Sequence, residues 1–376
     1  MHNIIYDHQT FIGQEFGGIS RYFCELAARV HRTEGFSARV IAPLHYNAYL
    51  PDCPVPQYAL RMPVRFRGES RLYRLINETL SPALTAMASP SLVHQTYYSQ
   101  LASRKSRAPI VLTVFDMIHE LFPDNFPVTD PIFRCKAARV AAADHVLCIS
   151  QSTANDLMRL FGVPAEKISI TYLAYSDIFA QTAEATELPP HVRPYVLYVG
   201  HRGGYKNFET ALRAYASSAR LRHEFDFVTF GGPASFSVTE QATMTNLSLR
   251  LGSVVRLGGS DEYLARAYRH ARAFIYPSRY EGFGIPPLEA MASGCVTVCA
   301  DSSSIPEVVG DAGLLFNPDD VDAARQSLED ACFDEALRAK LLVRGSARVR
   351  EFSWDRCAHQ TVNAYRQMIG TEWHRQ

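Results

Sequence analysis

The chain has 376 residues, of which 47% are hydrophobic and 20% are charged. This composition can bury a sizeable core and is not that of a disordered chain. Lysine plus arginine and aspartate plus glutamate both number 38, and this balance gives no global sign of a nucleic-acid-binding protein. The length favours two domains over one.

The cysteines and the apolar runs indicate the compartment. The eight cysteines form no C-x-x-C pair, which in a chain of this size predicts reduced thiols and a cytoplasmic protein. The start, "MHNIIYDHQTF", is not typical of a signal peptide because Asp7 and His8 follow a very short apolar run. The sequence contains no run of about 18 apolar residues, so we expect no spanning helix.

Short apolar runs alternate with longer amphipathic ones in the first half of the chain. The helical pattern at 19–32 is one of the amphipathic runs. The alternation predicts a parallel sheet with helices on both faces. The expected strands lie at 3–7, 38–43, 91–96, 110–116 and 145–150.

A proline-containing stretch at 179–194 reads as a linker, and the alternation then restarts. Helices are expected at 207–221 and 261–271, and the expected strands lie at 195–200, 226–232, 254–259, 273–278, 296–300 and 313–316. We therefore predict an α/β fold of two Rossmann-like domains, whose ligands bind beyond the carboxyl ends of the strands. The predicted domains are 1–180 and 195–354, with a helix at 355–376 that packs back on the first.

The stretch "YPSRYEGFGIPPLEAMASGC" (276–295) holds two glutamates around a glycine loop. Glycines permit close approach of the backbone to a ligand, and proline suits the first turn of a helix. We expect Glu281 in the loop, Glu289 in the first turn, and free amides at the helix start that bind phosphate. Two carboxylates beside a phosphate site suggest a nucleotide-sugar. The alternative is an ordinary solvated loop and an ordinary helical glutamate.

Two further glycine loops follow strands. Arg202 and Lys206 could hold a diphosphate in the loop after 195–200, although a solvated basic turn has the same letters. Gly17 and Gly18 open a helix after the first strand, and Ser20 could cap it. The loop is not a full G-x-G-x-x-G, which argues against a dinucleotide site.

The strand at 110–116 leads into Asp116, His119 and Glu120. Polar groups just beyond the carboxyl end of a strand face the expected ligand site, so Asp116 and His119 are candidate acceptor-side residues. A lone histidine is more often structural than catalytic. The loop therefore predicts a polar site without fixing which group acts.

An arginine-rich segment at 61–74 could contact anionic lipid headgroups or a lipid-linked pyrophosphate. A solvated loop or helix face explains it equally well. Its arginines are Arg61, Arg65, Arg67, Arg71 and Arg74.

The pair Asp320 and Asp322 spells D-x-D, but acidic residues at a helix start cap the helix, and we favour that interpretation over a metal site. No His, Cys and Asp cluster has zinc spacing. We therefore expect neither metal nor cofactor.

The motif E-G-F-G-I-P-P-L-E-A-M-A-S-G resembles the E-x7-E signature of retaining glycosyltransferases with the GT-B fold, in the group called family 4. The stretches 257–278 and 299–320 continue the resemblance, which extends over nearly the whole chain and is weakest at 44–90. The motif is specific for the family and poorly specific for the sugar. Where family members often show His-Asp, this chain has Phe115 before Asp116, so His119 is the candidate substitute.

The resemblance implies a set of site residues. Glu281, Asp116 and His119 would act at the reacting centre, and Gly259–Asp261 would choose the base. The implied donor-binding residues are Gly17, Gly18, Arg202, Lys206, Ser260, Gly282, Phe283, Gly284, Ile285 and Glu289.

The implied activity is metal-independent transfer of a hexose, with retention, to a hydroxyl of a lipid-linked or growing surface polysaccharide. The style of the motifs is most like bacterial O-antigen mannosyltransferases, so GDP-mannose is the expected donor, with GDP-rhamnose or a UDP-sugar as alternatives. Rival interpretations are a GT-B epimerase or phosphorylase and a non-catalytic nucleotide-binding scaffold. A cytoplasmic enzyme is expected, with a peripheral contact to the inner face of the membrane as an option.

Overall fold

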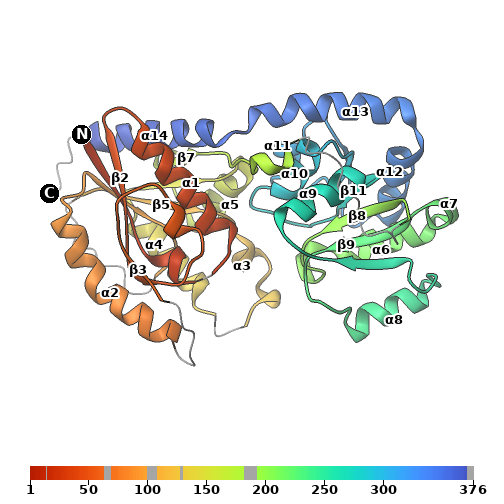
Figure 1. Cartoon of the computed structure of the whole chain (residues 1–376), viewed down its shortest axis with the longest axis horizontal. Coiled ribbons are helices and arrows are strands. Elements are labelled where there is room, and N and C mark those ends of the chain that lie inside the picture. Colours follow the sequence, from red (N-terminus) through yellow and green to blue (C-terminus); the bar gives the residue numbers. More distant parts are fainter. Residues whose placement is uncertain (14, 63–68, 100–107, 128–129, 182–192, 371–376) are drawn as a thin grey trace. The chain divides into compact units, whose positions relative to one another are not determined.

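A computed structural model describes residues 1–13, 15–62, 69–99, 108–127, 130–181 and 193–370. The chain divides into two compact units, and each is described by itself. The first unit comprises Met1–Leu173 together with Trp354–Gln376, and the second comprises Ala174–Ser353. Figure 1 shows the elements of both units with their labels.

The first unit is built on one sheet whose neighbouring strands run parallel, in the order β3-β2-β1-β4-β5-β6-β7. The central strands β4, β5 and β6 are buried along their whole length, as expected when helices cover both faces of a parallel sheet. The strands are β1 (His2–Tyr6), β2 (Phe36–His45), β3 (Gln57–Arg61), β4 (Leu92–Gln95), β5 (Ile110–Val114), β6 (His145–Cys148) and β7 (Ile168–Ile170).

The helices of the first unit include one that comes from the end of the chain. Helix α14 (Trp354–Gly370) packs against α1 (Gly18–Arg32), and the two run close together in Figure 1. The other helices are α2 (Glu69–Met87), α3 (Ile118–Leu121), α4 (Ile132–Ala142) and α5 (Gln151–Phe161).

A buried hydrogen-bond chain attaches α14 to the sheet. The Tyr365 hydroxyl lies 3.1 Å from the Tyr6 hydroxyl and 2.5 Å from His94 Nδ1, while His94 Nε2 lies 2.8 Å from Thr113 Oγ1. These residues belong to α14, β1, β4 and β5. Burial lowers the pKa of His94 to about 3, so its ring is neutral at pH 7. Each buried polar group thus has a partner, which fixes the last helix on the first unit.

The second unit has a sheet in the order β10-β9-β8-β11-β12-β13, also with parallel neighbours. The chain starts in the middle at β8, moves outward to β10, and returns to β11 on the other side of β8. The order reverses between β8 and β11, where ligands bind in doubly wound sheets. The strands are β8 (Tyr195–Val199), β9 (Asp226–Phe230), β10 (Val254–Leu257), β11 (Ala273–Tyr276), β12 (Thr297–Ala300) and β13 (Leu314–Phe316).

Alternate residues of these strands enter two apolar clusters, one on each face of the sheet. Val196 and Tyr198 of β8 pack with α6 and α12, whereas Tyr195 and Leu197 pack with α9, α10 and α11. The helices are α6 (Phe208–Ser217), α7 (Ala219–Glu224), α8 (Val238–Asn246), α9 (Asp261–His270), α10 (Ile285–Ala292), α11 (Ile305–Val309), α12 (Val321–Phe333) and α13 (Glu335–Arg348).

Every strand expected from the sequence is present in the structure. Strands β3 and β7 were not expected; β7 is only half-buried along its length, and β3 is the outermost strand of its sheet, so neither has a long apolar run. The helix expected at 207–221 is two helices. Ser218 ends α6 and caps α7 by accepting a hydrogen bond from the Leu221 amide.

Candidate active site

The loops that follow β8 and β11 meet at the point where the strand order of the second sheet reverses. Lys206, from the loop after β8, donates to both carboxylate oxygens of Glu281, at 2.7 and 2.9 Å. Glu281 lies in the loop after β11. Because β8 and β11 are neighbours, this ion pair joins the carboxyl ends of the two central strands.

The pair is partly exposed to solvent, and two tyrosine rings lie close to Lys206. The Lys206 side chain is 19% exposed and the Glu281 side chain 10%. Lys206 Nζ lies 5.4 Å from the ring centre of Tyr205 and 5.6 Å from that of Tyr276. Burial, and then the Glu281 carboxylate, raises the pKa of the Tyr276 hydroxyl well above its usual value. Tyr276 therefore stays neutral and can only act as a hydrogen-bonding group.

Three consecutive serines hold the loop that carries Glu281. Ser303 Oγ accepts from the Glu281 amide at 2.8 Å. Ser304 Oγ lies 2.8 Å from the Glu281 carbonyl and 2.6 Å from the Phe283 carbonyl, to which it donates. Ser302 donates to the Ser278 carbonyl at 2.8 Å. These bonds fix the backbone on both sides of Glu281, although the sequence analysis gave the serines no role.

Helix α10 begins directly after the glycine loop. Its N-cap, Gly284, has φ of 121°, a conformation that glycine adopts far more readily than other residues. The helix starts at Ile285, so Pro286 and Pro287 occupy its second and third positions and carry no N–H. We expected a row of free amides here; the two prolines leave Ile285 and the preceding glycine loop as the amide donors.

Glu289 lies in the second turn of α10 rather than the first, where the sequence analysis expected it, because the helix begins at Ile285. The Tyr268 hydroxyl, from α9, lies 3.5 Å from Glu289 Oε2. The two glutamates of the motif thus contact different elements: Glu281 the loop after β8, and Glu289 helix α9.

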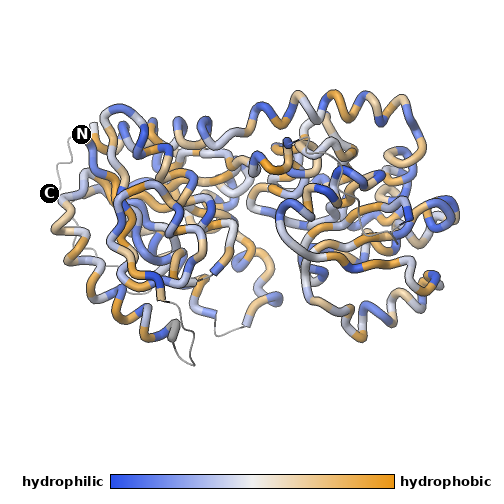
Figure 2. Tube along the Cα trace, in the orientation of Figure 1, coloured by the Kyte–Doolittle hydropathy of each residue, from blue (hydrophilic) through white to orange (hydrophobic). Residues whose placement is uncertain are grey.

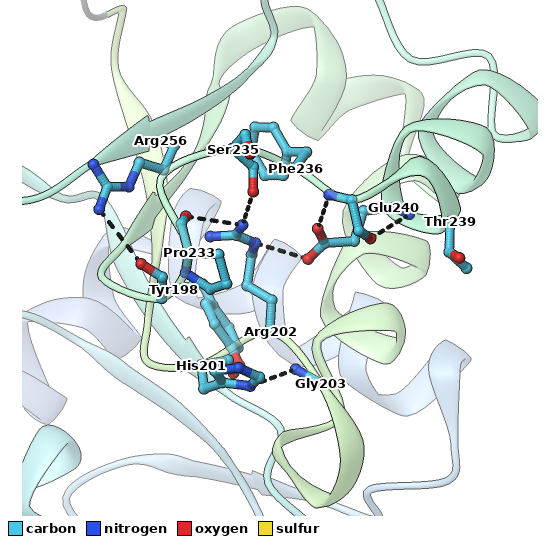
Figure 3. A network of polar contacts seen from close by, with 12 residues as sticks. Tyr198, His201, Arg202, Gly203, Pro233, Ser235, Phe236, Thr239, Glu240 and Arg256 are labelled. Carbon is cyan, nitrogen blue, oxygen red and sulfur yellow. Dashed lines mark hydrogen bonds and ion pairs between the residues drawn. The ribbon is translucent and has the colours of Figure 1, made fainter. Parts of the chain in front are cut away.

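Arg202 lies in the same loop as Lys206, but its guanidinium is directed into the protein (Figure 3). Its side chain is 1% exposed and its Nε lies 2.7 Å from Glu240 Oε1. It also donates to three backbone carbonyls, those of Gly231, Pro233 and Ser235. One bond from Nε, one from Nη1 and two from Nη2 use four of the five N–H groups of an arginine. Arg202 therefore fastens the loop after β9 to the loop after β8.

Glu240, the acceptor of the Arg202 ion pair, joins helix α8 to the loop after β8. It closes a capping box with Ser237 at the start of α8 and accepts from Arg202. None of the residues of α8 is fully buried, so this contact and the packing of Met244 on the apolar core together anchor the helix. A pocket of about 610 Å³ lies beside it, lined by residues that include His201, Asn207 and Arg279.

Gly259–Asp261, the segment expected to select the nucleotide base, leads into α9. Ser260 is the N-cap of the helix, but its side chain makes no capping hydrogen bond. A side chain on Gly259 would come within 2.9 Å of the Tyr263 ring. The close approach explains the glycine at this position.

In the first unit, Gly17 and Gly18 start α1 as expected. Gly17 is the N-cap, in an extended conformation with φ of −169°. Ser20 does not cap the helix: its hydroxyl donates to the Gly17 carbonyl at 3.0 Å. A side chain on Gly18 would meet nothing within 4 Å, so local geometry does not require a glycine at position 18.

The loop after β5 holds a buried ion pair that the sequence analysis missed. Lys136, from α4, is 1% exposed; it donates to Glu120 Oε2 at 2.7 Å and to the Asp116 carbonyl at 3.0 Å. Glu120 is 2% exposed. The pair lies beneath Asp116, whose side chain is 30% exposed. Sequence spacing offered no signal for it, because Lys136 is an ordinary helical lysine until the chain folds.

His119 stacks on Phe126, with ring centres 3.9 Å apart, and its Nε2 lies 3.7 Å from Asp130 Oδ2. Burial, followed by the Lys136 ammonium, lowers the pKa of His119. Its ring is therefore neutral at pH 7. Asp116 and His119 follow the same strand, and the Lys136 ammonium is close to both: it lies 3.8 Å from Asp116 Oδ1 and lowers the pKa of His119.

Phe115 stands where the family resemblance led us to expect a histidine. It is buried and packs edge-on against Tyr22 and Phe23, with ring centres 5.4 and 6.0 Å away. An aromatic core contact thus replaces a polar group. No contact of Phe115 makes it a candidate for chemistry.

The first sheet reverses its strand order between β1 and β4, and a missed aspartate lies there. Asp7 accepts from the Thr96 amide at 2.9 Å and from the Thr96 hydroxyl at 2.7 Å. Gln9 donates to its other oxygen at 2.5 Å. Asp7 is the first polar residue after β1, which is the signal that could have identified it.

The remaining predictions concern surface charges. Arg61, Arg71 and Arg74 are exposed, whereas Arg65 and Arg67 lie outside the described residues. Asp320 caps α12 by accepting from the Ala323 amide at 2.9 Å, as predicted. Within the described ranges we find no group of three His, Cys, Asp or Glu arranged to hold a metal ion, and no helix there combines the length and hydropathy of a membrane span.

Two family models match the chain. Residues 16–175 match "Glycosyltransferase Family 4" and residues 179–345 match "Glycosyl transferases group 1", which together span most of the sequence. The chain belongs to the family 4, group 1 glycosyltransferases. Its resemblance to that family, first seen in the E-x7-E motif, is confirmed.

Similar proteins support this membership. The "O-antigen chain mannosyltransferase B" of Escherichia coli is 36% identical over 237 residues, covering 60% of this chain and 61% of that protein. The chain thus spans about three fifths of that relative. A glycosyltransferase from Rickettsia africae has the same fold, with a TM-score of 0.73, 16% identity and 99% of both chains covered.

A third similar protein carries ligands. The Anabaena protein HepE, solved with UDP and glucose, has a TM-score of 0.71 and 17% identity, and covers 97% of this chain and 99% of its own. At these identities the structural matches establish the fold alone. The fold is GT-B, as predicted.

Proposed function

We propose that this glycosyltransferase moves mannose from GDP-mannose to a hydroxyl of a lipid-linked or growing surface polysaccharide, with retention of configuration and without a metal. The observation that carries the proposal is the Lys206–Glu281 pair at the reversal point of the donor-side sheet. The similarity to a protein named as an O-antigen chain mannosyltransferase supports the choice of sugar and acceptor.

The ion pair suits a site whose lysine must bind an anionic diphosphate and whose glutamate must bind the sugar once a donor enters. When a donor binds, Lys206 turns from Glu281 to the diphosphate, where its charge stabilises the leaving group. Glu281 is then released to accept hydrogen bonds from the sugar hydroxyls. Ser303 and Ser304 keep its backbone in place during this exchange, so only the side chains rearrange.

The transfer is a substitution at the anomeric carbon. The bond between that carbon and the phosphate oxygen breaks, and its electron pair leaves with the phosphate. The acceptor oxygen forms the new bond on the same face, and its proton passes to the departing phosphate oxygen. Positive charge on the sugar develops near the Glu281 carboxylate, which stabilises it.

The acceptor is assigned to the first unit. Asp116 is partly exposed beyond the end of β5 and can accept a hydrogen bond from a sugar hydroxyl. His119 is neutral at pH 7 because its pKa is lowered, so it can also accept one. The buried Lys136–Glu120 pair supports the backbone under both residues.

Replacing Glu281 by Gln tests the proposal. The change keeps the shape and removes the charge, so we expect transfer from GDP-mannose to fall by roughly 10²-fold or more. Glu209→Gln is the matched control, because Glu209 is exposed and pairs with Arg213 on its own helix. An unchanged rate in E281Q would show that Glu281 takes no part in transfer, whereas the absence of transfer by the unchanged chain would favour a non-catalytic scaffold.

The nucleotide is identified by a thermal-shift panel of GDP, UDP and ADP sugars on the full chain. A ligand present at 100 times its Kd adds about 2.7 kcal/mol of stability. We expect GDP-mannose to give the largest shift. A larger shift with GDP-rhamnose or a UDP-sugar would overturn the choice of donor and leave the transferase assignment intact.

A further inference from the structure

Two cysteines of the first unit, Cys24 and Cys53, are neighbours although 29 positions separate them in the chain. Cys24 is in the middle of α1, and Cys53 directly follows the short 3-10 helix Leu50–Asp52. Figure 2 shows both hydrophilic and hydrophobic residues along α1, and Cys24 is half-buried there. Cys53 Sγ lies 3.6 Å from the Cys24 carbonyl oxygen, and the two thiols share a side-chain hydrogen bond. The donor and acceptor sites use neither thiol.

The segment that leads to Cys53 is fixed to the start of α1 by further contacts. The Ala48 amide donates to the Glu15 carbonyl at 2.9 Å. Arg21 donates to the Tyr49 hydroxyl at 3.2 Å, and its guanidinium lies 5.0 Å from the centre of that ring. Because these contacts hold both segments before any sulfur reacts, joining the two sulfurs requires little movement of the backbone. Such proximity strongly favours a reaction between the held groups.

The pair differs from the other cysteines in exposure and in ionisation. All eight cysteines lie in the described residues, and Cys24 alone is not buried. A hydrogen bond from the Cys24 thiol lowers the pKa of Cys53, in spite of burial. Thiols with a raised pKa are protonated at pH 7 and react slowly with oxidants, because the thiolate is the nucleophile. Burial raises the pKa to about 12 in Cys148, Cys295, Cys332 and Cys357.

We propose that Cys24 and Cys53 are a reversible oxidation site, at which a peroxide joins the two sulfurs in a disulfide. The Cys53 thiolate attacks one oxygen of hydrogen peroxide, the O–O bond breaks, and hydroxide leaves and becomes water by taking the proton that Cys53 released. The Cys24 sulfur then attacks the Cys53 sulfur of the resulting sulfenic acid. The S–S bond forms, and the hydroxyl group leaves as water with the Cys24 proton. Two thiols and one peroxide thus give one disulfide and two waters.

The disulfide has a structural consequence for the first unit. It fixes the segment 47–53 on α1, and this segment already contacts Glu15, just before the glycines that start the helix. A cross-link over 29 positions also removes conformations from the unfolded chain. We therefore expect the oxidised first unit to be more stable than the reduced one. The proposal does not depend on the proposed function, because no donor or acceptor takes part in the oxidation.

The test is peptide mapping of the full chain by mass spectrometry. The reduced protein is treated with hydrogen peroxide, its free thiols are alkylated, and it is digested with trypsin without a reducing agent. Cleavage after arginine places Cys24 in the peptide 22–29 and Cys53 in the peptide 40–61. We expect these two peptides to be linked, and dithiothreitol to separate them. A link between two chains, or two thiols that are alkylated as fully as without peroxide, would overturn the proposal.

Cys295 and Cys332 of the second unit provide the matched control within the same sample. The charge of Cys332 affects the pKa of Cys295, so these two thiols are also close to each other. Both are buried, and both have a raised pKa. They should therefore remain free and alkylate only after unfolding. A Cys295–Cys332 link that forms as fast as the expected one would contradict a specific oxidation site in the first unit.

Thermal unfolding gives a second readout on the same protein. The oxidised chain should unfold with a midpoint about 5 °C or more above that of the reduced chain. The difference should vanish in Cys53→Ser and in Cys24→Ser, which each keep the size of the side chain and remove one sulfur. A lower midpoint after oxidation would overturn the proposal, because the link would then strain segments that should already be in place. Glu281→Gln should form the disulfide as fast as the unchanged chain, so the two proposals fail separately.

Discussion

Two lysine–glutamate pairs in this protein have the same length and opposite surroundings. Lys136–Glu120 and Lys206–Glu281 both span 2.7 Å, and both adjoin a loop at the carboxyl end of a central strand. The first pair is 1% and 2% exposed, and the second 19% and 10%. The first is enclosed under the loop after β5, whereas the second, where the strand order reverses, is partly reached by solvent.

Burial decides what each pair can do. A closed ion pair in a low-dielectric interior has exchanged water for its partner, and removing one member leaves a charge that nothing compensates. An ion pair that solvent reaches contributes less stability, so either side chain can exchange its partner for a ligand. Distance alone would have made the two equivalent. The difference predicts that one pair supports the fold and the other supports binding.

The largest effect expected is on stability when Lys136 is replaced by Met. The change leaves Glu120 as a buried, unpaired carboxylate and should destabilise the first unit by about 3–5 kcal/mol. Trp354, the first residue of α14, belongs to this unit, so its fluorescence during urea unfolding reports on it. The double variant Lys136→Met with Glu120→Leu should regain most of the loss. Equal losses in the single and double variants would contradict a buried ion pair.

The next prediction distinguishes the role of Arg202 from that of Lys206, which lies in the same loop. If Arg202 is the anchor of α8, a double-mutant cycle of Arg202→Met and Glu240→Gln should give a coupling of about 1.5–3 kcal/mol. The readout is hydrogen exchange of the α8 amides. The exposed pair Arg213–Glu209 is the control and should couple by about 0.3–0.5 kcal/mol.

Donor affinity then tests the role expected from the sequence. Glu240→Gln should weaken donor binding about as much as Arg202→Met if Arg202 acts by holding the loop. If Arg202 binds the diphosphate directly, as the sequence suggested, Glu240→Gln should leave the donor KM unchanged while Arg202→Met raises it. Lys206→Met should raise the donor KM in both cases.

The sequence predicted the strands well because a parallel sheet buried on both faces requires continuous apolar runs. It also predicted that loops beyond β5, β8 and β11 carry the candidate residues. It could not predict which side chains pair with one another. Arg202 and Lys206 look equivalent in the sequence, and only the path of the chain after β9 brings Glu240 to one of them.

The sequence also could not predict where a motif residue lies within its helix. Glu289 was expected in a first turn, but that turn is defined by where the backbone changes conformation at Gly284. The buried Lys136–Glu120 pair joins residues from two elements without a motif. The bonds between the Asn77 amide and the Leu44 backbone groups likewise join α2 to β2 without a sequence motif.

A smaller effect concerns the serines that hold the Glu281 loop. Ser304→Ala leaves two carbonyls, those of Glu281 and Phe283, without this donor. We expect a local loss of about 1–2 kcal/mol, measured as faster hydrogen exchange across 278–284, together with a lower kcat. Ser302→Ala is the control because it releases only Ser278. If both variants lower kcat equally, the serines act on the general stability of the loop and not on Glu281.

The smallest effect belongs to His94, which links α14 to the sheet of the first unit. Burial lowers its pKa to about 3 in the folded protein, against an ordinary value of about 6.5. The folded state therefore binds fewer protons than the unfolded state between these values, and its stability must fall as the pH drops through this window. Between pH 7 and pH 5.5, His94 should remove about 1 kcal/mol from the free energy of unfolding of the first unit.

The variant His94→Gln cannot take up this proton. Its tryptophan-detected urea unfolding should thus depend less on pH than that of the unchanged chain, although it starts from a lower stability because the bonds to Tyr365 and Thr113 are altered. The other buried histidines of the described residues, His8, His45 and His145, titrate in both proteins and cancel in the difference. Parallel pH profiles would mean that His94 is not held neutral, and the chain of hydrogen bonds that fastens α14 would then need a different proton arrangement.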